Sequence, residues 1–81
     1  MNTEKINALK EARNLSEEEA KLCSEEFSQT NLALKSALDN DESKEIERLI
    51  KESNKKERIF IKKIEHVLKA RKELNKELNR L

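Results

Sequence analysis

Apolar and small residues, interrupted at Arg13, Glu57 and Arg71, recur along this chain at alternating spacings of three and four, in two long stretches separated by a polar cluster near Asn40. This spacing is typical of one face of a helix that packs against another helix. In the first stretch the repeating positions are Ile6, Leu9, Arg13, Ser16, Ala20, Cys23, Phe27, Thr30, Leu34 and Ala37. In the second they are Ile46, Ile50, Ser53, Glu57, Phe60, Ile64, Val67, Arg71, Leu74 and Leu78. Each stretch predicts one long amphipathic helix.

The segment between the two stretches predicts a tight turn. Asp39-Asn40-Asp41 is the one cluster of helix-stopping residues, and an Asn such as Asn40 tolerates the left-handed backbone that ends many helices. Asp39, Asp41 or Ser43 can then cap the second helix. We expect a single domain over residues 1–81, with helices over about 3–38 and 43–80 and a turn over about 39–42. A capping-box pattern at Ser16 leaves open a break in the first helix.

Folding the chain at this turn aligns the two apolar faces with the helices antiparallel. The best alignment places Phe27 opposite Ser53 and Phe60 opposite Ala20, so that each large ring meets a small residue. Three pairs of opposite charge then flank the seam, namely Glu26 with Lys56, Glu19 with Lys63 and Lys5 with Glu77. The sequence therefore predicts an all-α protein, an antiparallel two-helix hairpin that resembles a coiled coil.

The composition supports long helices and excludes most other classes of domain. Charged residues make up 43% of the 81 residues and hydrophobic residues 35%, with neither Gly nor Pro. A β or α/β domain of this size would need turn residues and β-branched runs. Because no apolar run reaches about 18 residues, and residues 1–10 lack an apolar signal-peptide core, we expect a cytoplasmic protein with no transmembrane segment.

The residue pattern does not predict a catalytic site. Cys23 lies on the predicted seam as a small apolar group, far along the hairpin from His66, which is the only His. No second His or Cys accompanies either residue as a metal ligand, and a phosphate-binding loop would need Gly. The carboxylates are interleaved with Lys and lack an enclosed site. We therefore expect no enzyme, no catalytic residue, no metal and no cofactor.

Several apolar residues remain outside the predicted seam. They are Leu15, Leu22 and Ile59 on one flank of the hairpin and Ile61 and Leu68 on the other. Because two helices cannot cover both flanks, we expect a protein partner, either a second copy that completes a four-helix bundle or a helix of another protein. A domain-swapped dimer with a straightened turn is an alternative. The expected function is a non-enzymatic protein–protein interaction module, such as a small helical chaperone, an adaptor, or an assembly or anti-regulatory factor.

The distribution of charge adds a second functional hypothesis. The net charge is only +1, but residues 1–40 carry −3 and residues 41–81 carry +4. Basic residues follow the outer face of the second helix at Lys51, Lys55, Arg58, Lys62 and Lys69, and we call this group the basic ridge. Such a ridge is typical of nucleic-acid or acidic-surface binding, although no aromatic residue accompanies it to stack on a base.

One stretch resembles a known family. Lys51-Glu52-Ser53 followed by Ile61, Ile64 and His66 is similar to the second helix of the small co-chaperones of type III secretion needle subunits, and the size and helix–turn–helix layout are similar too. This resemblance covers less than a third of the chain. It implies a co-chaperone function, which is a minor alternative within the protein-interaction hypothesis.

Overall fold

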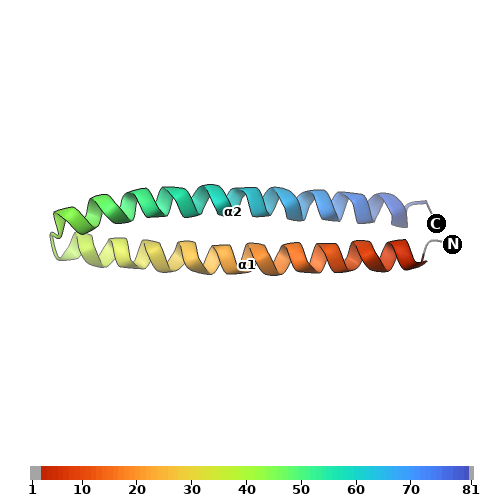
Figure 1. The fold of residues 1–81 in the computed structure, drawn as a ribbon, viewed down its shortest axis with the longest axis horizontal. Helices are drawn as coiled ribbons and strands as arrows, with labels where there is room; N and C mark the ends of the chain where they lie inside the picture. Colours follow the sequence, from red (N-terminus) through yellow and green to blue (C-terminus); the bar gives the residue numbers. More distant parts are fainter. Residues whose placement is uncertain (1–2, 81) are drawn as a thin grey trace.

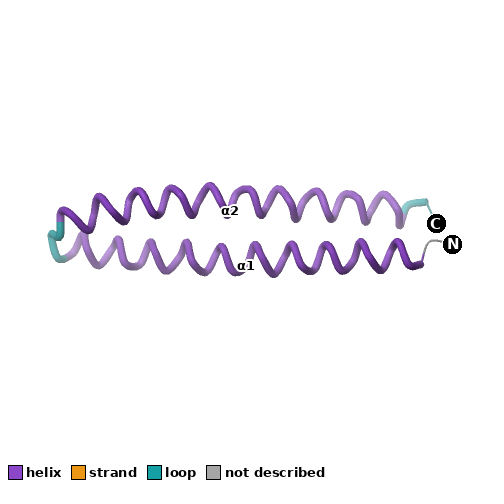
Figure 2. Tube along the Cα trace, in the orientation of Figure 1, coloured by secondary structure: helices purple, strands orange, loops and turns teal. Residues whose placement is uncertain are grey.

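The computed structural model describes residues 3–80 and shows an all-α, antiparallel two-helix hairpin (Figure 1). Helix α1 spans Thr3–Asp39 and helix α2 spans Ser43–Leu78, so both follow the expected ranges to within two residues. The rod measures 61 × 13 × 13 Å. The start of α1 and the end of α2 lie at one end of the rod, and the turn lies at the other (Figure 2). The predicted hairpin fold is confirmed.

Helix α1 is continuous through the capping pattern near Ser16. The Ser16 hydroxyl donates a hydrogen bond of 2.9 Å to the carbonyl oxygen of Ala12, one turn earlier in the same helix. A hydroxyl bonded in this way does not cap a new helix, because it points back along the existing one. The possible break near Ser16 therefore does not occur.

The turn is built on Asp41 and not, as expected, on Asn40. Asp41 has a φ of 52°, in the left-handed region. Its N–H bonds the carbonyl of Leu38 at 3.3 Å, and the N–H of Glu42 bonds the carbonyl of Ala37 at 3.0 Å. These two bonds form a Schellman motif, which satisfies carbonyl groups at the end of α1. The prediction that Asp39, Asp41 or Ser43 caps α2 is also wrong, because Glu42 holds that position and its side chain makes no cap hydrogen bond.

Helix α2 turns a different set of residues toward α1 than the one predicted. Leu49 is only 6% exposed and Glu77 only 7%, whereas Ile50, Ile64 and Leu78 remain 38–45% exposed. The residues of α2 that are buried or partly buried are Ile46, Leu49, Glu52, Ser53, Lys56, Phe60, Lys63, Val67, Ala70, Leu74 and Glu77. The predicted seam positions Ile46, Ser53, Phe60, Val67 and Leu74 are buried or partly buried, whereas Ile50, Glu57, Ile64, Arg71 and Leu78 are exposed. Of these exposed residues, Ile64 and Arg71 still line a groove between the two helices.

The different set of buried residues means that α2 is rotated about its own axis relative to the predicted orientation. The ion pairs between the helices are consistent with this rotation of α2. Lys63 lies 3.1 Å from Glu19 and Lys5 lies 3.0 Å from Glu77, as the sequence predicts. The third predicted pair, between Glu26 and Lys56, does not form, because Lys56 pairs instead with Glu52 of its own helix at 3.5 Å. Turning Lys63 and Glu77 toward α1 leaves the residue after each of them, Ile64 and Leu78, at the edge of the seam and partly exposed.

The middle of the seam combines two aromatic rings with satisfied polar groups. Phe27 and Phe60 lie near each other across the seam, with ring centroids 6.4 Å apart, and Phe60 also lines a groove together with the small residue Ala20, which the sequence places opposite it. The buried Ser53 donates a hydrogen bond of 2.7 Å to the Oδ1 atom of Asn31, and Thr30 donates one of 3.0 Å to the carbonyl of Glu26. Within residues 3–80, no buried side-chain nitrogen or oxygen atom lacks a partner.

Candidate interaction surface

The rotation of α2 leaves large aliphatic residues exposed on one flank of that helix, three of them adjacent. We call this group the α2 stripe and define it by Ile50, Ile61, Ile64, Leu68 and Leu78. Ile61, Ile64 and Leu68 follow one another at spacings of three and four, which places their side chains on a single face. Their exposed fractions range from 38% for Ile64 to 58% for Leu68, so the hairpin leaves much of each side chain uncovered.

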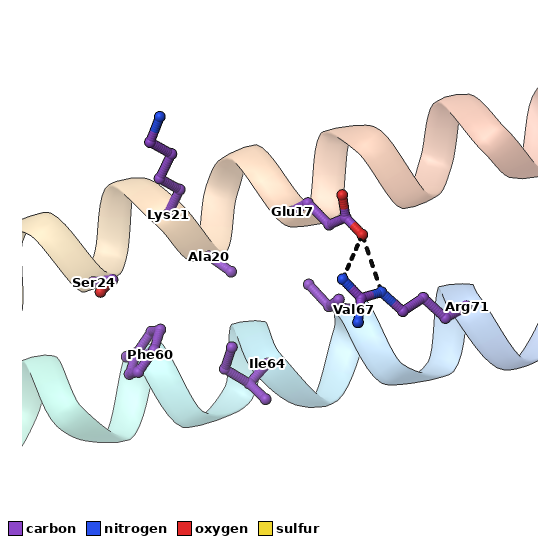
Figure 3. A pocket seen from close by; sticks show the side chains of 8 residues that line it. All are labelled: Glu17, Ala20, Lys21, Ser24, Phe60, Ile64, Val67 and Arg71. Carbon is purple, nitrogen blue, oxygen red and sulfur yellow. Dashed lines mark hydrogen bonds and ion pairs between the residues drawn. The ribbon is translucent and has the colours of Figure 1, made fainter.

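A groove of about 310 Å³ opens between the two helices beside the stripe (Figure 3). Its apolar lining comes from Ala20 of α1 and from Phe60, Ile64 and Val67 of α2. Glu17, Lys21, Ser24 and Arg71 supply its polar lining. The groove is open along its length, which suits an inserted side chain better than an enclosed small molecule.

An ion pair crosses one end of this groove. Arg71 donates hydrogen bonds from Nε and Nη2 to the Oε1 atom of Glu17, at 3.0 and 2.7 Å (Figure 3). The Arg71 side chain is 55% exposed, because its long stem carries the guanidinium out of the seam. Arg71 therefore links α1 to α2 and also marks where the apolar part of the flank gives way to a polar part.

A second hollow, of about 520 Å³, continues along α2 from Arg71 toward the C-terminal end. Leu68, Lys72, Asn75, Lys76 and Asn79 line it together with Arg71. This end of the flank is therefore basic and amide-rich. The whole flank offers an apolar middle, at Ile61, Ile64 and Leu68, followed by a positively charged end.

The predicted interface residues lie on opposite flanks of the rod. Ile61 and Leu68 belong to the α2 stripe. Leu15 and Leu22 are one helical turn from Glu19, and Ile59 is one turn from Lys63, so these three surround the Glu19–Lys63 ion pair on the other flank. All five are exposed, as expected. The spacing of Ile50, Ile64 and Leu78 predicts seam positions, so their exposure could not be read from the sequence pattern.

The residues of the basic ridge are exposed as a group. Lys51, Lys55, Arg58, Lys62 and Lys69 are all exposed and form no ion pair with a described residue.

Arg48, near the start of α2, is held instead by carboxylates of its own helix. It lies 2.7 Å from Glu45 and 3.2 Å from Glu52. Its hydrogen bonds with Glu45 lower the pKa of that carboxyl and raise the pKa of the guanidinium.

The described residues also bear on the requirements of a metal site, a disulfide and a membrane span. Within residues 3–80, no group of three or more His, Cys, Asp or Glu side chains is placed to hold a metal ion. Cys23 is a free, partly buried thiol. Neither helix is long and apolar enough over its described residues to cross a membrane.

No protein-family model matches this chain, and comparisons with curated proteins and with solved structures give no match either.

Proposed function

We propose that this protein is a non-enzymatic protein–protein interaction module that binds a helical partner through the α2 stripe, in the manner of a small helical chaperone, adaptor or assembly factor. The exposed α2 stripe is the observation that carries the proposal. Scattered exposed apolar residues are common in folded proteins. Five large aliphatic residues lie on one flank, spread over roughly 42 Å of helix from Ile50 to Leu78, and the adjacent Ile61, Ile64 and Leu68 form a face of the kind that another helix covers.

The stripe supports this function better than the opposite flank does. On the opposite flank, Leu15, Leu22 and Ile59 are separated by the Glu19–Lys63 ion pair, which keeps charge at the centre of the surface. On the stripe, Ile61, Ile64 and Leu68 are contiguous and border an apolar groove. Binding energy in protein interfaces concentrates in contiguous apolar groups of this kind, surrounded by polar residues.

Photo-cross-linking in the native cell tests the proposal. A benzophenone amino acid at position 68 should cross-link to a protein, and this product should persist in high salt because apolar contacts are not screened. The matched control is position 32, since Leu32 is 67% exposed but lies on α1 away from the stripe. Adding Ile61→Ser should abolish the product formed at position 68. The same products from both positions, or no product from position 68, would refute the function.

The basic ridge supports a second candidate function, the binding of nucleic acid or an acidic surface. This second candidate rests on the five exposed basic residues of the ridge, which have no ion-pair partner in residues 3–80. Salt separates the two functions, because binding through several Lys and Arg contacts weakens steeply between about 50 and 200 mM salt, whereas apolar helix pairing does not. The nearly balanced charge of the chain, with a formal net value of +1, favours the first function.

A further inference from the structure

We infer that the α2 stripe binds a second copy of this chain, with the two α2 helices antiparallel about a two-fold axis at Ile64. The inference rests on the proposed function, because it assigns the partner of the same surface. It also specifies which residues of the two copies are in contact. The order of aliphatic, amide and charged side chains along the flank carries the inference.

The nine exposed positions along the flank are complementary to their own reversed order about Ile64. The exposed residues that follow one another along it are Ile50, Asn54, Glu57, Ile61, Ile64, Leu68, Arg71, Asn75 and Leu78. Reversing this order pairs aliphatic with aliphatic, amide with amide and acid with base. The resulting pairs are Ile50 with Leu78, Asn54 with Asn75, Glu57 with Arg71, Ile61 with Leu68, and Ile64 with its own copy.

The spacing along the helix lets these pairs form together. Glu57 lies seven residues before Ile64 and Arg71 seven after, so both reach the same height when the helices run antiparallel about Ile64. Ile61 and Leu68 lie three and four residues from Ile64, which leaves their heights matched to within about 1.5 Å. A surface that meets its own copy across a two-fold axis must be self-complementary in this way.

The two charged positions select the antiparallel direction. A parallel pair would place Glu57 against Glu57 and Arg71 against Arg71, and like charges in contact oppose association. Antiparallel pairing instead gives two Glu57–Arg71 contacts between the copies. Glu57 is exposed and forms no ion pair with a described residue, so its carboxylate is available. Arg71 uses only Nε and Nη2 for Glu17, and a guanidinium has further N–H donors.

The groove beside Ile64 supplies room for side chains of the second copy. Its apolar lining, from Ala20, Phe60 and Val67, lies next to Ile64 on the side of α1. A second α2 seated at the two-fold axis would place its own Ile61 and Ile64 against this lining. The product is a four-helix bundle with α2 paired to α2 in its middle, and the overlap from Ile50 to Leu78 covers roughly 42 Å of each helix.

Charge reversal tests the pairing, with dissociation constants measured by sedimentation equilibrium. Glu57→Arg and Arg71→Glu should each weaken self-association by about a hundredfold or more, while circular dichroism shows that each variant remains helical. An equimolar mixture of the two variants should form a heterodimer with near-parental affinity, because every contact then joins opposite charges. The double variant should also dimerise. A monomeric parent chain, unaffected single variants, or a mixture that stays monomeric would overturn the inference.

Disulfide trapping locates the axis independently of charge. In a Cys23→Ser background, Ile64→Cys should form a covalent dimer under mild oxidation, whereas the control Lys62→Cys, on the basic ridge at almost the same height, should not. Equal yields from both variants would refute the axis. Failure of this pairing is distinguishable from failure of the proposed function: a heterologous cross-link at position 68, formed by a chain that stays monomeric, refutes the two-fold pairing alone.

Discussion

Removing the two most exposed contiguous residues of the α2 stripe should separate association from folding. Ile61 is 49% exposed and Leu68 is 58% exposed, so about half of each side chain is available to a partner. Complete burial of such a side chain is worth about 1.5–3 kcal/mol, and half of it therefore about 1 kcal/mol. A symmetric dimer contains four of these side chains. The change Ile61→Ser/Leu68→Ser should then cost about 4 kcal/mol of association, which corresponds to roughly a thousandfold weaker dimer.

The fold of the hairpin should survive this change. Because the removed atoms lie mostly outside the seam, the free energy of unfolding of the isolated hairpin should shift by only about 0.5 kcal/mol. Sedimentation equilibrium measures the dimer, and chemical denaturation at a concentration where the variant is monomeric measures the fold. The matched control is Leu15→Ser/Leu22→Ser, whose residues are 58% and 60% exposed on the opposite flank. An equal loss of affinity in the control, or an unchanged dimer in the stripe variant, would refute the reasoning.

Further substitutions examine the seam, the turn and the ridge. Leu74→Ala removes the most completely buried side chain, at 2% exposure, and should lower the free energy of unfolding by about 2–5 kcal/mol in urea titrations. Asp41→Gly relieves the cost of a left-handed residue and should stabilise the turn by about 1 kcal/mol, which raises Tm by about 4–8 °C. Changing Lys55, Arg58 and Lys62 to Glu should leave self-association intact. If the ridge binds nucleic acid, the same change should abolish the gel shift of a nucleic-acid probe, and an unchanged gel shift would eliminate the ridge as a nucleic-acid site.

The hairpin itself could be predicted because three independent features of the sequence agree. Two periodic stretches have the length of long helices, and a single cluster of helix-stopping residues separates them. The opposite charges at Glu19 and Lys63 and at Lys5 and Glu77 then match only when the chain folds at that cluster. Local preference, apolar pattern and charge all indicate the same fold, which is the condition under which sequence reasoning is most secure.

The rotation of α2 could not be predicted from spacing. An apolar seam of period 3.5 can run through Leu49 or through Ile50, since each lies one turn from Ile46 and from Ser53. Apolar content favours the wrong choice, because the rejected positions include Ile64 and Leu78. The structure instead turns the positions that carry ion-pairing side chains toward α1. For the same reason Ile64, in the middle of the candidate site, could not be predicted as an exposed residue, because its spacing assigns it to the seam.

The rotation of α2 and the proposed partner support each other physically. The seam that faces α1 includes the partly buried Lys56 and Lys63, whereas the more aliphatic positions, including Ile50 and Ile64, remain partly exposed. For an isolated hairpin this arrangement exposes the more apolar of two possible faces, which the hydrophobic effect opposes. A second helix that covers the stripe removes that cost, while the ion pairs to Glu19 and Glu77 still hold α1 in place. Helix α2 thus has the pattern expected of a helix with two neighbours, and α1 supplies only one of them.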